Sequence, residues 1–378
     1  MSSTIVQVPG ISADDWDVGA AFSGASTSVS VGRNASTNQK YGLRFPSVPI
    51  PVGATITSAV LTFTCQQTRA DTPTVRIYAN AADNPTAPTN LAVEAALVRS
   101  TASVDWTIPA TTINVPFNSP DLSAPIQEVV NRAGWAFGNA LILLVDNLAT
   151  DATRLTSFYT RDNNSGLAQP YLTLTWSHPS KDMASVTVAA SGDDVACPTT
   201  TNTFDASSAT IVFGRSTVVS KCLFRFANTQ VAKNATIEYA RVVFRQSATI
   251  SLAPTLSVKG AAADNVSAPA DQTAADAIAR TSASVAWSTG GGGAAGTLLR
   301  TPDITSIVQE IVNRSGWAAG NAMGIFVECT SPSGSPSATV YTKDGDASFG
   351  QAAPRLEIVY TVTNTGVRHR NRLLLDIG

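Results

Sequence analysis

Two pairs of adjacent acidic residues are the positions in this chain whose type and spacing could bind a metal ion. Asp14 and Asp15 open one predicted loop, and Asp193 and Asp194 open an equivalent loop in the second half of the chain. Carboxylate oxygens are the ligands that calcium prefers, so calcium is a candidate cofactor, and the sequence indicates no other. Asp also favours turns, because its side chain bonds to nearby backbone N–H groups, and this explanation stays open.

Catalytic motifs are missing from the sequence. Histidine, the side chain that most often transfers protons in enzymes, occurs only as His178 and His369, and no GxSxG, HExxH or Walker motif is present. Glu128 and Glu310 are the acidic position that both predicted helices share, and paired carboxylates can hydrolyse glycosides. Contact with solvent or with a neighbouring Arg explains them more simply. We expect no catalytic residues and no enzymatic activity.

Three aromatic residues could form a platform for a sugar, because the apolar face of a pyranose ring stacks on aromatic rings. Trp16, Phe22 and Tyr41 have no aromatic counterpart in the second half of the chain, so they are the candidate ligand-binding residues. The tryptophans that both halves share are instead expected in the core, since Trp is largely buried on average: Trp106, Trp135, Trp287 and Trp317.

The last residues form a basic and then apolar strip, VRHRNRLLLDIG, beyond the final predicted strand. Such a strip could add to a neighbour's sheet or groove, although a free chain end can also be disordered. We favour docking to a partner, because the apolar run would be costly to leave in water. The predicted docking residues are Arg368, Arg370, Arg372, Leu373, Leu374 and Leu375.

An internal repeat explains why several of these features occur in pairs. The stretch 121–145, DLSAPIQEVVNRAGWAFGNALILLV, aligns without gaps on 303–327, with 13 of 25 positions identical at an offset of 182. RSTASVDW at 99–106 answers RTSASVAW at 280–287 at nearly the same offset. The repeat therefore spans whole domains.

Two domains of similar size follow from the repeat. The first covers residues 1–177, a polar linker covers 178–184, the second domain covers 185–362, and the docking tail covers 363–378. A chain of 378 residues also exceeds what one hydrophobic core usually serves. The four cysteines show no CxxC spacing, and no disulfide pairing can be deduced from them: Cys65, Cys197, Cys222 and Cys329.

Each half alternates apolar and polar residues with a period of two. Ala59, Leu61 and Phe63 are an example, and such alternation predicts half-buried antiparallel strands. The run LILLV at 141–145 is apolar throughout, which predicts a central strand covered on both faces.

One short helix is expected in each half. It follows Ser123 or Thr305 as the N-terminal cap, and Gly134 or Gly316 ends it. The predicted fold class is therefore all-β, with two tandem jelly-roll-like β-sandwich domains that each contain one short helix.

Three motifs carry a resemblance to a known family. The first is LRF…IPVGATITSAVLTF at 43–63. The second is the helix motif PD[LI][TS]xx[VI]QE[VI]VNRxGWxxGNA at 120–140 and 302–322. The third is the closing strand PxLx[LI]x[WY] at 170–176 and 354–360. These motifs resemble the DNRLRE or disaggregatase-related repeat family and the kindred alginate-type carbohydrate-binding modules, over nearly the whole chain. The resemblance implies non-enzymatic β-sandwich modules of microbial surface proteins and polysaccharide-degrading enzymes. Similar modules occur in virion proteins of tailed phages.

Two functions are expected from these observations. We expect no secretion signal, because the start of the chain lacks a basic stretch followed by an apolar run. This favours a structural protein of a tailed-phage virion, assembled in the host cytoplasm. It would be a capsid decoration, fibre or tail component that binds other virion proteins and itself.

The alternative is a glycan-binding module protein that recognises surface polysaccharide, either on the host or as an extracellular or cell-surface protein. The sequence argues against two other partners. A net charge of −2 predicts no nucleic-acid partner, and the lack of a long apolar run predicts no membrane insertion.

Overall fold

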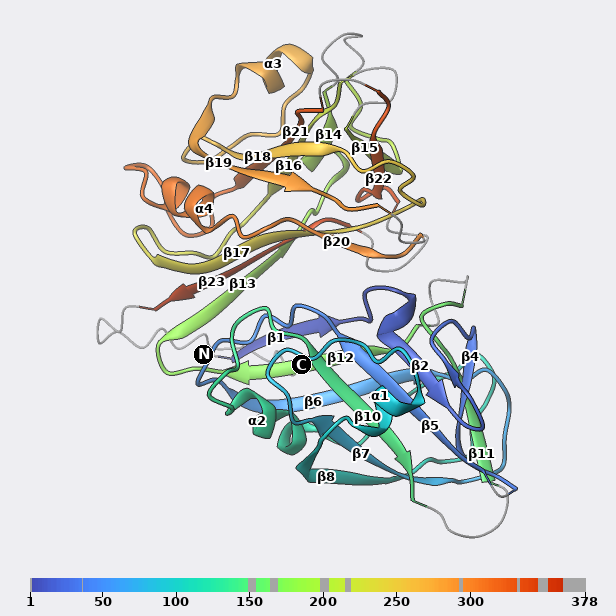
Figure 1. The fold of residues 1–378 in the computed structure, drawn as a ribbon. Helices are drawn as coiled ribbons and strands as arrows, with labels where there is room; N and C mark the ends of the chain where they lie inside the picture. Colours follow the sequence, from blue (N-terminus) through green and yellow to red (C-terminus); the bar gives the residue numbers. More distant parts are fainter. Residues whose placement is uncertain are drawn as a thin grey trace, which may run out of the picture.

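Antiparallel strands dominate the chain, as the alternation of apolar and polar residues predicts. The computed structural model describes residues 2–35, 37–148, 154–163, 169–197, 204–214, 219–291, 295–331, 334–345 and 353–362. Two β-sandwich domains follow each other along the chain and are stacked one on the other (Figure 1). The predicted all-β, jelly-roll-like fold class is confirmed, but the described residues of each domain form two α-helices where one was expected.

The first domain packs a small sheet against a larger one. The small sheet has the order β1-β12-β6-β9, with bounds Ser2–Gln7, Tyr171–Ser177, Thr55–Thr64 and Pro116–Asn118. The large sheet has the order β11-β4-β5-β10-β7-β8, with bounds Arg154–Tyr159, Ser28–Asn34, Thr37–Phe45, Leu141–Asn147, Thr74–Asn80 and Arg99–Thr107. β2 pairs with β5 and with β3 beside this sheet, at Asp15–Val18 and Phe22–Ser23.

The second domain repeats this arrangement. Its small sheet has the order β13-β23-β17-β20, with bounds Lys181–Thr187, Arg355–Thr361, Thr236–Arg245 and Leu298–Arg300. The sheet opposite it has the order β14-β16-β21-β18-β19, with bounds Asp194–Ala196, Lys221–Phe226, Met323–Cys329, Thr255–Ala261 and Arg280–Ser288. A separate pair, β15 and β22, spans Thr210–Gly214 and Ser337–Tyr341.

The predicted strand faces form the cores. Leu61 and Phe63 of β6 are fully buried in the core of the first domain. β10 lies between β5 and β7, and its residues Leu141–Val145 are all buried, which confirms the predicted central strand. The four shared tryptophans are buried as expected: Trp106, Trp135, Trp287 and Trp317.

The helices that close the sandwiches begin differently from the prediction. α2 (Ser123–Val130) and α4 (Thr305–Val312) pack their apolar side chains into the cores. Ser123 is the first helical residue, and Leu122 holds the cap position. The backbone N–H and the hydroxyl of Ser123 both donate to the carboxylate of Asp121. Thr305 donates to Asp303 in the same way. The unexpected helices α1 (Leu91–Ala95) and α3 (Gln272–Ala277) are capped by Asn90 and Asp271.

The glycines predicted to end α2 and α4 have another role. Both helices end earlier, at Val130 and Val312. A Cβ at Gly134 or Gly316 would lie 2.1 Å from a carboxylate oxygen, that of Asp83 or Asp264. Glycine at these positions therefore lets an acidic side chain approach the backbone.

The predicted linker is shorter than expected. Lys181 and Ala184 lie in β13, which pairs along its length with β23. The polar composition of residues 178–184 suggested a linker, but backbone pairing at a sheet edge does not require apolar side chains. The second domain thus begins at Lys181, and the predicted tail at 363–378 lies outside the described residues.

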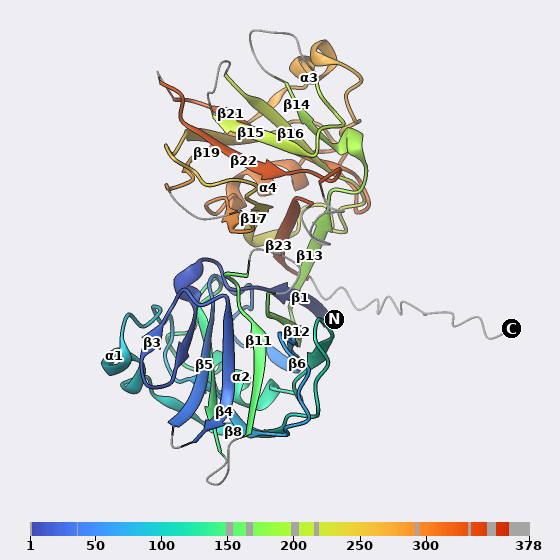
Figure 2. The same ribbon diagram turned by 90° about the vertical axis from the view of Figure 1, so that its right-hand side faces the viewer.

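The small sheet of the second domain turns its outer face toward the first domain. Figure 2 shows β13 and β23 between the two sandwiches, close to β1. In β17, core-facing Val242 and outward-facing Arg241 are both buried. At the matching outward positions of the first domain, Val60 and Thr173 are partly exposed. Within the described part of the chain, no helix is long and apolar enough to cross a membrane.

Gly42 of β5 is a position where the fold requires glycine. A Cβ there would lie 2.1 Å from Cε2 of Trp16, whose indole lies against this strand. We expect Gly42→Ala to lower the free energy of unfolding of the first domain by about 1–3 kcal/mol, as overpacking does. Urea denaturation followed by Trp fluorescence measures this. Gly24→Ala, which would meet its nearest atom at 3.8 Å, is the matched control. Equal stability of the two variants would contradict the prediction.

Candidate functional site

Asp14 holds a loop of the first domain in place. It ends a short 3₁₀ helix, and its Oδ2 accepts hydrogen bonds of 3.0 Å from the backbone N–H groups of Gly10 and Ile11. Its Oδ1 forms an ion pair of 2.7 Å with Nη1 of Arg44. These contacts employ both carboxylate oxygens of Asp14.

Asp15 is buried on the other side of the same turn. Its Oδ2 accepts from the Tyr41 hydroxyl and from the Arg161 backbone N–H, both at 2.7 Å, while its Oδ1 has no hydrogen-bond partner among the described residues. Burial raises the pKa of Asp15 to about 7, and the neighbouring charge of Asp162 adds to this effect. The hydrogen bonds from Arg161 and Tyr41 act in the opposite direction.

The second domain repeats this acidic turn. Asp193 forms an ion pair of 2.6 Å with Nη1 of Arg225. Asp194 accepts a hydrogen bond of 2.6 Å from the Lys343 backbone N–H, and in the part of the chain that the structure describes its Oδ1 is also without a partner. Burial again raises the pKa to about 7. Cys222 lies at the register position that Tyr41 holds in the first domain, so Asp194 lacks the hydroxyl donor.

The predicted calcium ligands are not gathered into a metal site. Within each pair, one carboxylate binds an Arg and the other binds a backbone N–H from a distant loop. No group of three or more His, Cys, Asp or Glu residues that could hold an ion occurs among the described residues. The acidic pairs therefore act as loop anchors, the alternative that turn chemistry offered.

The predicted aromatic platform is wrong for two of its three residues. Trp16 and Tyr41 are only 2% and 1% exposed, and Phe22 is partly buried against Trp16. Trp16 covers Ile142 and Leu144, the side of β10 that faces away from the main core. The apolar run at 141–145 was the signal for this, because a strand apolar on both faces needs a cover on both.

The shared glutamates of the helices also have structural contacts. Glu128 accepts two hydrogen bonds of 2.8 Å from the backbone N–H groups of Thr101 and Ala102. Glu310 repeats them with Ser282 and Ala283, again at 2.8 Å. Each glutamate joins its helix to the end of the neighbouring strand.

The boundary between the domains is the polar site that sequence reasoning missed. Arg241 donates to Oε2 of Glu357 at 2.7 Å and to the carbonyl oxygen of Ser47, in the first domain, at 2.8 Å. Arg161 of the first domain donates to the hydroxyl of Thr297. A sequence signal for this site did exist. Arg241 and Glu357 are charged at outward strand positions where the first repeat has the uncharged Val60 and Thr173.

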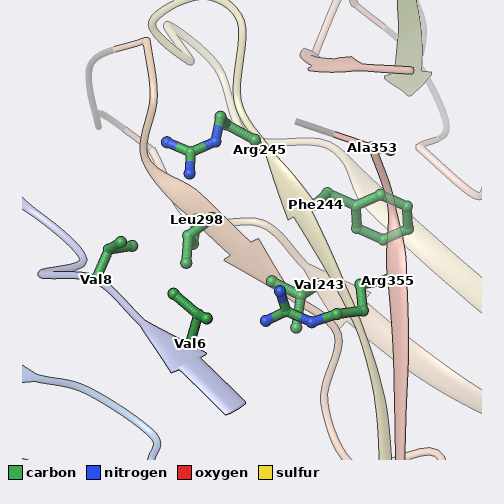
Figure 3. Close-up of a pocket in the computed structure, with 8 residues that line it drawn as sticks. All are labelled: Val6, Val8, Val243, Phe244, Arg245, Leu298, Ala353 and Arg355. Carbon is green, nitrogen blue, oxygen red and sulfur yellow. The ribbon is translucent and has the colours of Figure 1, made fainter. Parts of the chain in front are cut away.

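A pocket opens at this boundary. Val6 and Val8 of the first domain face Val243 and Leu298 of the second, and the guanidinium groups of Arg245 and Arg355 flank them (Figure 3). Phe244 and Ala353 complete its lining.

Comparisons with known proteins give weak matches. No family model and no curated protein matches the chain. It is similar to PNGase F, a glycosylasparaginase from Flavobacterium meningosepticum, at 9% identity over 96% of both chains, with a TM-score of 0.23. It is similar to the CBM22 tandem of Paenibacillus barcinonensis Xyn10C at 10% identity, over 96% of this chain and 99% of that one, with a TM-score of 0.18. It is also similar to the structure of infectious bursal disease virus Gx strain at 12% identity, over 96% of this chain and 76% of that one, with a TM-score of 0.19.

These matches correct one prediction from the sequence. We expected no enzymatic activity, whereas three of the similar structures are of a peptide-N-glycanase. The similarity to these enzyme structures contradicts that expectation. TM-scores of 0.17 to 0.24 support no argument about function, so the amidase activity remains a property of those proteins.

The buried aspartates make stability depend on pH. The folded chain keeps the protons of Asp15 and Asp194 up to about pH 7, whereas an unfolded Asp releases its proton near about pH 4. The free energy of unfolding therefore falls as the pH rises through this window. We expect Asp15→Asn to be more stable than the wild type at about pH 8 and to flatten the dependence measured by urea denaturation.

Asp105→Asn is the control for this experiment. The Asp105 side chain is half exposed, and the hydrogen bond from Arg76 lowers its pKa, so it does not titrate in this window. A slope unchanged by Asp15→Asn would show that Asp15 is not the titrating group.

Chelation tests the calcium prediction directly. Because Asp14 and Asp193 are paired with arginines, we expect EDTA to leave the melting temperature of the full chain unchanged. A fall of several degrees that added calcium reverses would instead establish calcium as a cofactor, since a ligand that binds the folded state raises its stability.

Proposed function

We propose that this chain is a structural protein of a tailed-phage virion, which displays two rigidly joined β-sandwich modules as a capsid decoration, a fibre or a tail component. The buried joint between the modules carries the proposal. Its partners are other virion proteins and further copies of the same chain.

The joint is polar, buried and specific. Arg241 and Glu357 are each 1% exposed, and Arg241 donates both to Glu357 and, across the boundary, to the carbonyl oxygen of Ser47. Because both charges are withdrawn from water at the joint, the contact of Arg241 with Ser47 is needed to satisfy the guanidinium there, and this fixes how the two domains meet. Ser3 donates to Asp182 at 2.8 Å at another point of the boundary. A component that recurs at fixed positions in a particle needs such a fixed geometry.

An aromatic contact adds to this joint. The rings of Phe137 and Tyr239 lie with centroids 4.2 Å apart across the boundary. Aromatic pairs of this kind contribute about 0.5–1.5 kcal/mol beyond their buried area. Phe137 corresponds to Ala319 in the second repeat, so this contact belongs to the joint and not to the repeated fold.

The residues that both domains share support a scaffold role. Arg132 pairs with Asp83 at 2.6 Å, and Arg314 pairs with Asp264 at 2.8 Å. These pairs hold the segment after the helix, α2 or α4, against the segment after the strand, β7 or β18. The resemblance of the repeat motifs to modules of tailed-phage virions supports the choice of assembly. Trp16 does not support the glycan-binding alternative, because its ring is buried.

Quantitative mass spectrometry of purified particles from the source organism tests the proposal. We expect the chain in a fixed ratio to the major capsid or tail protein, retained after a salt wash. A chain absent from particles would overturn the proposal. A glycan array that shows binding lost in Phe22→Ala and kept in Phe204→Ala would favour the alternative, because both rings are partly buried and occupy different domains.

A further inference from the structure

The acidic turn of the first domain is connected to the joint through Arg161. The backbone N–H of Arg161 donates to Oδ2 of Asp15 at 2.7 Å. The side chain of the same residue is buried, and its Nη2 donates to the hydroxyl of Thr297 in the second domain. One residue therefore links a buried carboxylate of the first domain to the segment before β20 of the second domain.

The segment that Arg161 contacts belongs to the surface at which the domains meet. Thr297 is buried, and its carbonyl oxygen accepts a hydrogen bond of 2.8 Å from the N–H of Gln246, just after β17. The next residue, Leu298, lines the pocket at the domain boundary (Figure 3). Loss of the contact between Arg161 and Thr297 would therefore loosen the joint at this point.

Asp15 is buried without an ion pair. Its two donors are the Tyr41 hydroxyl, from β5, and the Arg161 backbone N–H, and neither group is charged. Among the described residues its Oδ1 has no partner. The Arg161 guanidinium instead contacts Thr297 and, at 3.4 Å, Asp162. A buried carboxylate that no cation contacts favours its protonated form.

The charges around Asp15 act on it in both directions. Burial is the largest effect and raises the pKa of Asp15 to about 7. The negative charge of Asp162 also raises it, whereas the hydrogen bonds from Arg161 and Tyr41 and the positive charge of Arg161 lower it. The net result is a carboxyl group that changes its charge near neutral pH.

Two further carboxylates lie on the same turn, and both have partners. Asp14 forms an ion pair of 2.7 Å with Arg44. Asp17 of β2 accepts a hydrogen bond of 2.7 Å from the hydroxyl of Ser26. Of the two buried carboxylates, Asp14 and Asp15, only Asp15 lacks an ion pair within the described ranges.

We propose that Asp15 is a pH-sensitive switch for the joint between the two domains. While Asp15 is neutral, it holds the Arg161 backbone in place, and the guanidinium reaches Thr297. When Asp15 ionises, its Oδ1 carries charge in a site that excludes water, and the turn relieves this cost by opening to solvent. The segment that contains Arg161 moves with the turn, so its contact with Thr297 is lost.

The direction of the switch follows from the two states of the carboxyl group. The closed turn keeps the proton up to about pH 7, whereas a solvated Asp releases it near about pH 4. The closed turn is therefore favoured below neutral pH and loses this advantage as the pH rises through about 7. The inference goes beyond the proposed function and does not depend on it, because the contacts lie within one chain.

The second repeat has the same turn away from the joint. Asp194 accepts from the Lys343 backbone N–H, and its Oδ1 is buried without a partner in the described part of the chain. Asp194 begins β14, which belongs to the sheet on the far side of the second domain from the joint (Figure 1). Ionisation of Asp194 should weaken its own turn and leave the joint unchanged, so Asp194→Asn is a matched control.

Hydrogen exchange of the full chain, followed by mass spectrometry at about pH 6 and about pH 8, tests the proposal. The readout is the protection factor of residues 295–300 in the second domain, which is corrected for the effect of pH on chemical exchange. We expect protection to fall by about tenfold at the higher pH, because one pH unit above a pKa shifts the equilibrium by about tenfold.

Two variants separate the acidic turns. Asp15→Asn cannot ionise and should abolish the fall at 295–300, although residue 15 lies in the other domain. Asp194→Asn should keep the fall, and in this variant β21 should stay equally protected at both pH values, because only the joint loosens. A fall lost in Asp194→Asn and kept in Asp15→Asn would overturn the proposal. Protection in the wild type that is unchanged or higher at the higher pH would overturn it too.

Thr297→Val removes the acceptor of the Arg161 side chain and leaves Asp15 intact. Residues 295–300 of this variant should already be weakly protected at the lower pH and should change little at the higher one. If Thr297→Val keeps the protection and the fall of the wild type, the contact between Arg161 and Thr297 does not carry the signal and the proposal is wrong. This variant also decides the outcome if Asp15→Asn fails to fold.

Discussion

The ion pair between Arg241 and Glu357 is the interaction on which the arrangement of the molecule depends. Both side chains are 1% exposed, and water would solvate both if the domains separated. Inside the joint, where water is excluded, the carbonyl oxygen of Ser47 takes the place of water as an acceptor for the Arg241 guanidinium. The joint therefore holds the two repeated domains together as one unit. It also explains why β17 and β23 are buried on both faces.

Carboxylates that accept hydrogen bonds from backbone N–H groups are a recurring device within each domain. Glu128 joins α2 to β8. Asp121 accepts from the N–H of Ser123 at the start of α2 and from the N–H of Ala59 at 2.7 Å. Asp15 joins β2 to the segment after β11. A backbone donor in a loop or helix end needs a partner when it is buried. Residues whose types suggested metal or acid chemistry thus meet this need, and duplication preserved them for that reason.

Local patterns accounted for most of the fold. The period of two placed Leu61 and Phe63 in the core, and the apolar run at 141–145 identified β10, because side-chain alternation follows from strand geometry alone. The candidate site was less predictable. Trp16 and Tyr41 lacked counterparts in the second repeat, which suggested a ligand platform, but the first domain uses them to cover β10 and to bond Asp15.

The sequence by itself determined that the chain folds twice into the same all-β module, because the repeat preserves strand faces, helix positions and core tryptophans. Only the tertiary structure decided what the differing positions do. Arg241 and Arg300 stand at outward strand positions where an exposed charge would be unremarkable in a single domain. The role of these arginines depends on which surface covers them. That surface is determined by packing between residues almost two hundred positions apart, such as Arg241 and Ser47. No local pattern encodes such a contact.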